Sequence, residues 1–203
     1  MATRLTRTER AEANREAVLD AARRVFLAKG YHGTTVDAVA REAGFTIGAV
    51  YSRFAGKADL FLALLEQRVE ERIEQYRDFP TSLEPTADAV EAARWWAGNV
   101  HTDLEWLLLV IEFRVHAAPD PELNRRYAEL HERHIGAFAG FVERYVDEAD
   151  ANAFARAALS MGSGFALARA AEGDAFPDAL FEELAVGISE RLLADGRQTK
   201  EVA

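Results

Sequence analysis

Hydrophobic residues recur along most of the chain at intervals of three and four positions, which places them on one face of an α-helix. Near the N-terminus, one such stripe is formed by Val18, Leu19, Ala22, Val25 and Phe26. The stripe stops at Gly30, and glycine is the commonest residue just past a helix end, so we expect the first helix to end there. No convincing run of alternating apolar and polar residues predicts a strand.

Two short helices are predicted next, and both have recognisable start signals. Thr34 and Asp37 have the spacing of a capping box, in which two side chains satisfy the first backbone N–H groups of a helix. Gly44 is expected to end this helix. Thr46 is the N-cap candidate for a second short helix over residues 47–54.

The rest of the chain also has a helical pattern. A long amphipathic helix is predicted over residues 57–76, and a loop with two prolines over residues 78–85. Gly173 and Gly196 are expected to end the last two helices. The helices expected after the loop lie over about residues 86–100, 102–118, 121–146, 151–172 and 177–194. The pattern therefore predicts an all-α protein of about nine helices.

Residues 35–54 have the pattern of a helix-turn-helix, whose second helix presents its N-terminal end to the major groove of DNA. Gly44 lies where the chain must turn, Ala40 is small where the helices cross, and Val50 is placed to face the first helix. The second helix otherwise carries mainly small, hydroxyl and cationic residues. A plain helical hairpin is the alternative, but its exposed face would more often carry Glu–Lys pairs.

This region is similar to a known family. The stretches GTTVDAVAREAG (33–44) and GAVYSRFAGK (48–57) resemble the tetracycline-repressor (TetR) family of bacterial transcriptional regulators. The resemblance covers roughly residues 12–65 and includes the turn glycine, the Tyr-x-x-Phe pair and the lysine that begins the fourth helix. Beyond this region, the chain resembles the family in its length and helical pattern.

The resemblance implies a helix-turn-helix DNA-binding domain over residues 1–60, with a basic arm at 1–10, and a helical ligand-binding and dimerisation domain over residues 61–203. It implies a homodimer that binds a near-palindromic double-stranded DNA operator and is released from it by an unknown small-molecule effector. Repression is the family default, and no catalytic role or cofactor is expected. The alternative class is a helical small-molecule-binding protein or enzyme with a vestigial helix-turn-helix.

The resemblance also implies which side chains touch DNA. Thr35 is expected to cap the second helix, and Thr35, Tyr51 and Lys57 are expected to meet phosphates. The residues expected near the base edges are Thr46, Gly48, Ala49, Ser52 and Arg53. Many relatives have polar side chains at the positions of Ile47 and Ala49. Base recognition in this chain is therefore expected to rest on Thr46, Arg53 and apolar contacts.

The net charge of −10 is distributed unevenly. Residues 1–60 carry ten Lys and Arg against seven Asp and Glu, so they are net +3 while the remainder is net −13. Arg4, Arg7 and Arg10 are expected to precede the first helix, as an arm that contacts DNA or as a solubilising tail. Charge alone favours neither a polyanion partner nor a chance basic segment.

The composition narrows the chemistry further. The chain has 203 residues, of which 49% are hydrophobic and 29% charged, which is typical of a globular protein and too apolar for disorder. It contains no cysteine, which excludes disulfides, thiolate metal sites and cysteine nucleophiles. The N-terminal residues lack the apolar segment of a secretory signal, and no apolar run is long enough to span a membrane. We therefore expect a cytoplasmic location and no membrane partner.

Two pairs of side chains are metal candidates. Glu112 and His116 lie one helical turn apart, as do His131 and His134 on the following predicted helix. Facing helices hold metals with such side chains in some bundles, but Glu and His are also common on solvated faces. Arg133 lies between the two histidines, so the solvated-face interpretation is favoured and no metal is expected.

The C-terminal region offers candidates for a dimer interface and an effector pocket. The predicted helix around residues 157–170 is rich in Ala and Gly, which suits close helix packing. The interface is expected to involve Gly162, Gly164, Phe165, Leu180, Leu184 and Ile188. An aromatic pocket is expected to involve Trp95, Trp96, Phe113, His116, Phe138 and Phe165. The polar side chains expected to orient a ligand are Arg94, Asn99, His116 and Arg169. Internal packing is the alternative for both sets.

Overall fold

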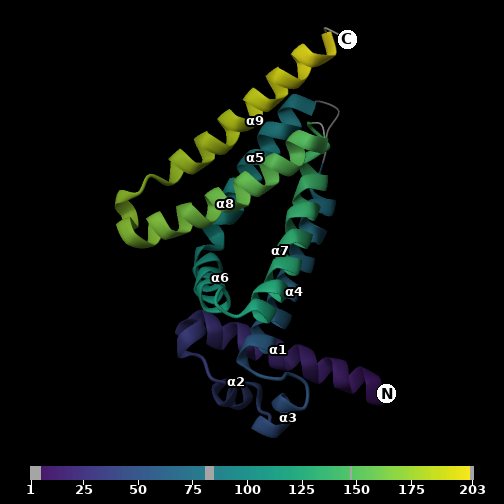
Figure 1. Cartoon of the computed structure of the whole chain (residues 1–203), viewed down its shortest axis with the longest axis vertical. Coiled ribbons are helices and arrows are strands. Elements are labelled where there is room, and N and C mark those ends of the chain that lie inside the picture. The colour runs from purple at the N-terminus through teal and green to yellow at the C-terminus, as the bar shows by residue number, and fades with distance from the viewer. Residues whose placement is uncertain (1–5, 81–84, 147, 202–203) are drawn as a thin grey trace, which may run out of the picture. The chain divides into compact units, whose positions relative to one another are not determined.

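The computed structural model describes residues 6–80, 85–146 and 148–201, and all regular secondary structure in these ranges is helical (Figure 1). The all-α prediction is confirmed. The α-helices are α1 (Arg7–Gly33), α2 (Val36–Ala43), α3 (Ile47–Tyr51), α4 (Lys57–Asp78), α5 (Pro85–Thr102), α6 (Leu104–Ala117), α7 (Pro121–Val142), α8 (Glu148–Glu172) and α9 (Asp178–Glu201). A short 3-10 helix, η1 (Gly173–Ala175), follows α8. Within the described ranges, no helix is long and apolar enough to cross a membrane.

The chain folds into two compact units. The first comprises residues 1–68 and 112–128, so it combines α1 to α3 with the first half of α4, the end of α6 and the start of α7. The second comprises residues 69–111 and 129–203. Residues 112–128 therefore belong with the N-terminal helices, although they are distant from them in sequence.

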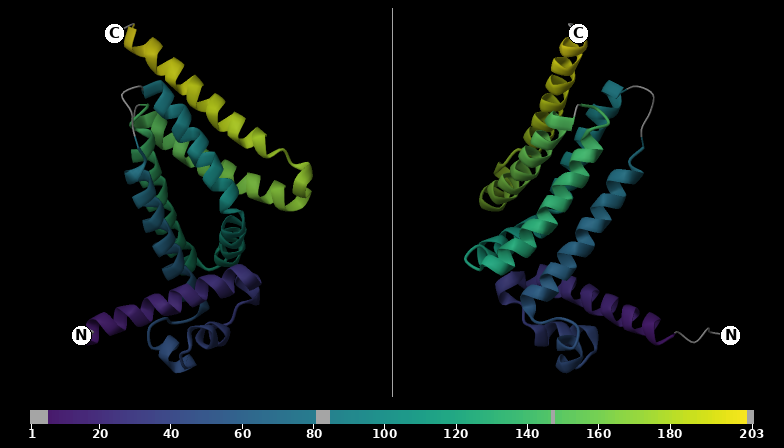
Figure 2. Two further views of the ribbon diagram at one scale, coloured as in Figure 1. Left: turned by 180° about the vertical axis from the view of Figure 1, so that it is seen from behind. Right: turned by 45° about the vertical axis from the view of Figure 1, so that its right-hand side comes forward.

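The first unit is built around the long helix α1. The apolar stripe of α1 faces inward, and Val18, Leu19 and Phe26 are each exposed by 2% or less. Helix α2 packs on α1, and α3 packs on α2 (Figure 2). The ring of Phe26 lies 5.2 Å from that of Phe61 on α4, which lies 4.6 Å from that of Phe113 on α6. Since full burial of a large apolar side chain contributes about 1.5–3 kcal/mol, these rings hold α1, α4 and α6 together.

Helix α1 begins with a capping box. The Thr6 hydroxyl accepts from the Glu9 N–H at 3.2 Å, and the Glu9 carboxylate accepts from the Thr6 N–H at 2.6 Å. Arg7 and Arg10 therefore lie in the first turns of α1, which corrects our expectation that they precede the first helix on an arm. Arg4 lies outside the described residues.

The end of α1 is kinked at Gly30, whose φ of 69° and ψ of 174° are not helical. Gly30, where we expected the helix to end, is therefore a kink within it, and α1 continues to Gly33. Thr34 is buried, and its hydroxyl donates to the Gly30 carbonyl at 2.8 Å. The predicted capping box of Thr34 and Asp37 is therefore wrong, and Thr35 is the N-cap of α2.

The second unit is a helical bundle with many aromatic side chains. Helix α5 packs along α9, and α8 contacts both (Figure 2). The core cluster of this unit includes Tyr76, Trp96, Phe138, Phe141, Phe165 and Phe181. Because these rings come from α4, α5, α7, α8 and α9, their burial joins five helices around one core.

Several predicted boundaries in the chain shift in the structure. Gly173 ends α8 as predicted, with a φ of 59° that glycine adopts without strain. The predicted stop at Gly196 is wrong, because α9 continues to Glu201. Helices α3 and α7 end at Tyr51 and Val142, before the predicted positions 54 and 146.

Candidate nucleic-acid interface

Local backbone chemistry defines α2 and the turn after it. Thr35 has an extended backbone, and its hydroxyl accepts from the Ala38 N–H at 3.2 Å. Gly44 ends the helix in the left-handed conformation, with φ 72° and ψ 23°, which favours glycine. The Phe45 N–H then donates to the Ala40 carbonyl at 2.9 Å. These bonds reverse the chain toward α3.

Helix α3 starts in the same way as α2. The Thr46 hydroxyl accepts from the Ala49 N–H at 3.2 Å, so Thr46 is the N-cap as predicted. Val50 of α3 and Val39 of α2 are both fully buried, which fixes the inner side of α3 on the core of the first unit. The predicted helix-turn-helix is confirmed.

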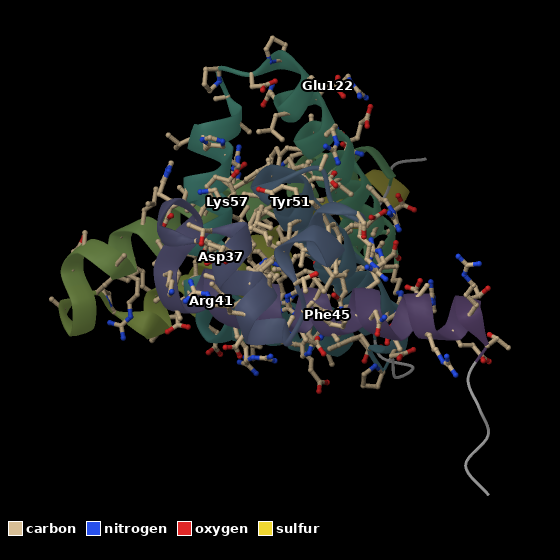
Figure 3. The ribbon with its side chains drawn as sticks, turned by 90° about the horizontal axis from the view of Figure 1, so that it is seen from below. Asp37, Arg41, Phe45, Tyr51, Lys57 and Glu122 are labelled. Atoms are coloured by element: carbon tan, nitrogen blue, oxygen red, sulfur yellow. The ribbon has the colours of Figure 1, made fainter. Side chains whose placement is uncertain are left out.

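The outer side of α3 is open. Ile47 and Tyr51 are 45% and 52% exposed, although both are large and apolar, and Thr46 and Gly48 are exposed beside them. A Cβ added at Gly48 would meet no described atom within 4 Å. Figure 3 looks onto this end of the first unit, with Tyr51 of α3 and Arg41 of α2 labelled. This face can approach another molecule closely, because nothing projects from the backbone at position 48.

Ser52 and Arg53 follow α3 and are bonded to it. The Ser52 hydroxyl donates to the Ala49 carbonyl at 2.8 Å, and the Arg53 guanidinium donates to the same carbonyl at 2.9 Å. Both side chains are exposed, whereas Ala49 is half-buried. Ser52 or Arg53 can contact DNA only by giving up its hydrogen bond to the Ala49 carbonyl. Their contact with DNA stays a prediction.

Lys57 begins α4 and reaches the end of α1. Its ammonium donates to the Tyr31 carbonyl at 3.0 Å and to the His32 carbonyl at 3.4 Å. It also lies 4.6 Å from the centre of the Tyr31 ring. The positive charge thus meets the carbonyl end of α1 while the side chain stays half-buried at the N-terminus of α4. Its predicted contact with a phosphate stays a prediction.

An ion pair that the sequence analysis missed holds the loop after α3. Arg126 of α7 donates to Asp59 Oδ1 at 2.7 Å, and the Ala55 N–H donates to Asp59 Oδ2 at 3.0 Å. Partial burial raises the pKa of Asp59, but the hydrogen bonds from Arg126 and Ala55 and the charges of Arg126 and Arg15 outweigh it and hold that pKa below its usual range. The start of α7 thereby positions the loop that follows α3.

A second missed contact joins α6 to the kinked end of α1. Glu112 Oε2 accepts from the Tyr31 N–H at 2.8 Å. One turn later on α6, the His116 ring lies 4.9 Å from the Tyr31 ring and 5.7 Å from the His32 ring. Glu112 and His116 therefore contact the end of α1 within the first unit.

The second pair of metal candidates lies in the other unit. His134 Nε2 is hydrogen-bonded to the Tyr76 hydroxyl at 2.9 Å. Across the described ranges, no three His, Asp or Glu side chains are grouped in a way that would hold a metal ion.

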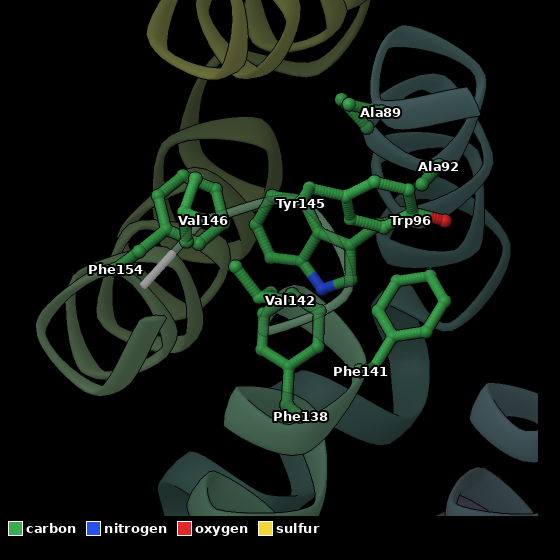
Figure 4. Close-up of a pocket in the computed structure, with 10 residues that line it drawn as sticks. Ala89, Ala92, Trp96, Phe138, Phe141, Val142, Tyr145, Val146 and Phe154 are labelled. Atoms are coloured by element: carbon green, nitrogen blue, oxygen red, sulfur yellow. The ribbon is translucent and has the colours of Figure 1, made fainter. Parts of the chain in front are cut away.

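A small apolar cavity of about 40 Å³ lies between α5, α7 and α8 in the second unit (Figure 4). The residues that line it are Ala89, Ala92, Ala93, Trp96, Phe138, Phe141, Val142, Tyr145, Val146 and Phe154. Trp96 and Phe138 were predicted pocket residues, and the structure brings them together with their ring centres 5.6 Å apart. A cavity that is mostly apolar with few polar groups is typical of small-molecule sites.

The other predicted pocket residues lie elsewhere. Trp95 lines a separate open groove between α4 and α5, together with Glu71 and Glu91. Phe113 and His116 belong to the first unit. Phe165 packs on Phe181, with ring centres 4.6 Å apart.

The polar side chains expected to orient a ligand have protein partners. Asn99 accepts from Arg72 at 2.9 Å, Arg94 lies 3.5 Å from Glu182, and Arg169 donates to a backbone carbonyl of η1. In the described part of the chain, none of these three lines the apolar cavity.

The predicted dimer-interface residues divide into two sets. Leu180 and Leu184 are 42% and 50% exposed and lie one turn apart on α9, and Gly164 is exposed on α8. Gly162 and Phe165 are buried within the unit, and Ile188 is half-buried. The exposed leucines form an apolar strip on α9.

Two capped helices joined by a glycine turn, with an open outer face on the second, form a helix-turn-helix, the motif whose second helix can enter the major groove of DNA. Residues 18–64 match the family model described as bacterial regulatory proteins, tetR family. The matched residues include α2, α3 and the start of α4, and so contain the whole helix-turn-helix.

Individual relatives are similar in the same region. The HTH-type transcriptional regulator SrpR of Pseudomonas putida is 47% identical over 58 residues, which cover 29% of this chain and 27% of SrpR. The HTH-type transcriptional repressor BepR of Brucella suis biovar 1 is 44% identical over 62 residues, which cover 30% of this chain and 29% of BepR. The matches thus span less than a third of either relative's length.

A solved structure extends the likeness in fold. The transcriptional regulator FadR from Bacillus subtilis, determined in complex with stearoyl-CoA, aligns with a TM-score of 0.65 over 86% of this chain and 96% of FadR. The two sequences are 16% identical, so the likeness is one of fold.

Proposed function

We propose that this chain is a sequence-specific DNA-binding transcriptional regulator that acts as a homodimeric repressor and leaves its operator when a small-molecule effector binds. The observation that carries the proposal is the open outer face of α3, where Gly48 exposes bare backbone between Thr46 and Tyr51. A DNA major groove admits such a helix end, and small side chains allow it to approach the bases.

The exposed side chains fit two kinds of contact. The Thr46 hydroxyl and the Ala49 methyl group suit base edges, where a methyl contacts thymine and a hydroxyl bonds either edge. Thr35, Tyr51 and Lys57 are placed at helix starts or on the outer face, where they suit phosphates. Phosphate contacts fix the position on DNA, and base contacts supply the sequence preference.

Two copies are needed for useful specificity. Helix α3 has five residues and so offers few base contacts. A symmetric dimer doubles them if its two recognition helices match half-sites about 34–36 Å apart. The exposed strip of Leu180 and Leu184 supports a self-complementary apolar interface.

The apolar cavity of the second unit supports an effector site. Helices α4, α6 and α7 each contribute residues to both units, so a ligand that moves them acts on chain segments shared with the DNA-binding unit. A coupling of about 1–3 kcal/mol between the two sites is enough for a useful response. FadR from Bacillus subtilis binds stearoyl-CoA with a similar fold, and BepR of Brucella suis is a repressor, which supports a ligand-responsive repressor here.

Fluorescence anisotropy tests the proposal. The chain is titrated into a labelled duplex from the DNA that flanks its own gene, and into a scrambled duplex of the same composition. We expect saturable binding of the first duplex, at least about 10³-fold tighter than the second. Equal binding of both duplexes, or of neither, contradicts the proposal. Turnover of a small molecule without operator binding would favour a helical enzyme.

A further inference from the structure

Tyr145 lines the apolar cavity and carries a buried polar atom. Among the described residues, its hydroxyl is the buried side-chain atom that has no hydrogen-bond partner. Native proteins pair nearly all such groups, so an orphaned one calls for an explanation. A ligand oxygen bonded to this hydroxyl would recover the free energy that its burial costs.

The surroundings of Tyr145 keep its hydroxyl protonated. Burial raises the pKa of Tyr145, and the carboxylates of Asp88 and Glu91 add to the rise. Arg144 opposes it through its charge and through a side-chain approach that lacks the geometry of a hydrogen bond. Figure 4 shows the Tyr145 ring extending toward α5, where Ala92 lies. At neutral pH the hydroxyl is therefore a hydrogen-bond donor at the edge of an otherwise apolar space.

The cavity walls favour flat apolar groups and disfavour charge. Trp96 stacks on Phe138 with ring centres 5.6 Å apart, and Phe138 and Phe154 are 6.3 Å apart. A ligand ring inserted among them would continue the usual spacing of aromatic pairs. All lining residues are uncharged, and the neighbouring Arg144 lies outside the lining and donates to the Tyr76 and Phe79 carbonyls. An ionised ligand in the cavity would therefore lose its hydration without gaining a counter-ion among the lining side chains.

The cavity is small and must widen to hold a ring. Its volume of about 40 Å³ suits roughly three water molecules, whereas a benzene-sized ligand occupies an apolar cavity of about 150 Å³. The rings that close the space come from α5, α7, the turn after α7 and α8. A ligand that enters must separate these side chains. It therefore binds the form of the protein with a widened cavity more tightly than the form with a closed cavity.

We propose that the effector is a small uncharged aromatic molecule with one hydrogen-bonding oxygen, held between the cavity rings and bonded to the Tyr145 hydroxyl. This assignment rests on the proposed function, because it names the effector class of a ligand-responsive regulator. It differs from an acidic or cationic effector in needing no charged partner in the site.

Calorimetric titration of the full chain without DNA tests the ligand class. The probes are p-cresol, toluene and benzoate, which share a ring and differ in their polar group. We expect p-cresol to bind about three- to tenfold more tightly than toluene, and benzoate to show no binding. Tyr145→Phe should lower the affinity for p-cresol to that for toluene and leave toluene binding unchanged. Tyr127→Phe, which removes a hydroxyl outside the cavity, is the matched control and should leave both affinities unchanged.

A space-filling variant locates the site independently. Val146 is half-buried and lines the cavity, so Val146→Phe should abolish binding of p-cresol and toluene while the helical circular dichroism signal is retained. The proposal is overturned if wild-type protein fails to bind p-cresol, if benzoate binds as tightly as p-cresol, or if either cavity variant binds p-cresol like wild type.

Operator titrations separate this proposal from the function on which it rests. Binding of p-cresol at Tyr145 by a chain that binds no operator supports the ligand site and contradicts the regulator. If the chain binds its operator and benzoate releases it while p-cresol does not, the proposed regulator is supported. The proposal that the effector is an uncharged aromatic molecule is then overturned.

Discussion

Gly30 satisfies two separate requirements at the end of α1. Its φ of 69° lies in the left-handed region that favours glycine. An added Cβ would also lie 3.0 Å from both carboxylate oxygens of Glu112, the group that accepts from the Tyr31 N–H. The close approach of α6 to the kink therefore depends on the absence of a side chain at position 30.

We expect Gly30→Ala to lower the free energy of unfolding by about 1–3 kcal/mol, because it strains the backbone and crowds Glu112. Gly33→Ala is the matched control, since its φ is not positive and its Cβ would meet the Lys29 Cβ at 3.4 Å. Urea unfolding followed by circular dichroism measures both variants. Equal stability of the two variants would contradict this account of the kink.

Lys57 tests the phosphate contacts. If its ammonium leaves the Tyr31 carbonyl to meet a phosphate, Lys57→Ala should weaken binding to all duplexes similarly and flatten the salt dependence of affinity by about one unit. Lys29→Ala removes an equal charge from an exposed position on α1 and is the control. Anisotropy at several salt concentrations gives the slopes. If the salt dependence of affinity has the same slope in Lys57→Ala and in wild type, Lys57 does not contact a phosphate.

At the scale of the elements, the start of α7 supports the loop after α3 through Asp59 and Arg126. Because the pKa of Asp59 is lowered in the folded state, its contribution to stability is present above its ordinary pKa and is lost as pH falls through the lowered value. Arg126→Gln should therefore be less stable than wild type at neutral pH, and the difference should shrink as pH falls below 3.8, the ordinary pKa of an aspartate.

Urea unfolding of both proteins across this pH range checks the prediction. In an Asp59→Asn background, the pH-dependent effect of Arg126→Gln should be much smaller, because only the exposed Glu122 then titrates under the charge of Arg126. A stability difference that is constant with pH, or that grows as pH falls, would show that Arg126 does not act through the Asp59 carboxylate.

The helix-turn-helix was predictable because its signals are local. Thr46 and Gly44 each act within four residues, through a cap bond and a left-handed turn. The spacing of Thr34 and Asp37 predicted the wrong cap for α2, because the kink at Gly30 buries Thr34. The family resemblance implied Thr35, which is the cap in the structure.

The contacts of the α6–α7 segment were not predictable for a different reason. Glu112 bonds a backbone group 81 residues away, and Arg126 pairs with a carboxylate 67 residues away. Similarly, Trp95 and Trp96 are neighbours in sequence, but successive helical residues point about 100° apart. Trp96 therefore lines the cavity while Trp95 lines the open groove.

At the scale of the whole molecule, assembly determines whether two recognition helices act on one operator. Leu180 and Leu184 on α9 are more than two-fifths exposed, as is Leu167 on α8. Apolar side chains of this size on neighbouring helices suit a surface that a second copy covers. The exposed Gly164 on α8 would allow such a copy to approach closely.

Gly164→Arg tests this arrangement. A bulky charge within a close helix contact would be buried without a partner, so we expect a monomer and a loss of palindromic operator binding of at least about 100-fold. Gly136→Arg is the matched control, because Gly136 is an exposed glycine of α7 with no described atom within 4 Å of its added Cβ. Light scattering gives the mass of each. A monomeric wild type, or a dimer unaffected by Gly164→Arg, contradicts the interface on α8 and α9.

The central claim is that the outer face of α3 contacts DNA, and Gly48→Glu tests it most directly. The Cβ of the new side chain would meet no described atom within 4 Å and position 48 is exposed, so the fold should be retained, while the carboxylate would face the bases and phosphates. Gly98→Glu makes the same change at an exposed position on α5 and controls for added negative charge. Anisotropy on the flanking duplex should show Gly98→Glu binding like wild type and Gly48→Glu binding at least about 100-fold more weakly, with unchanged helicity. A folded Gly48→Glu protein that binds the duplex as tightly as wild type would contradict the account.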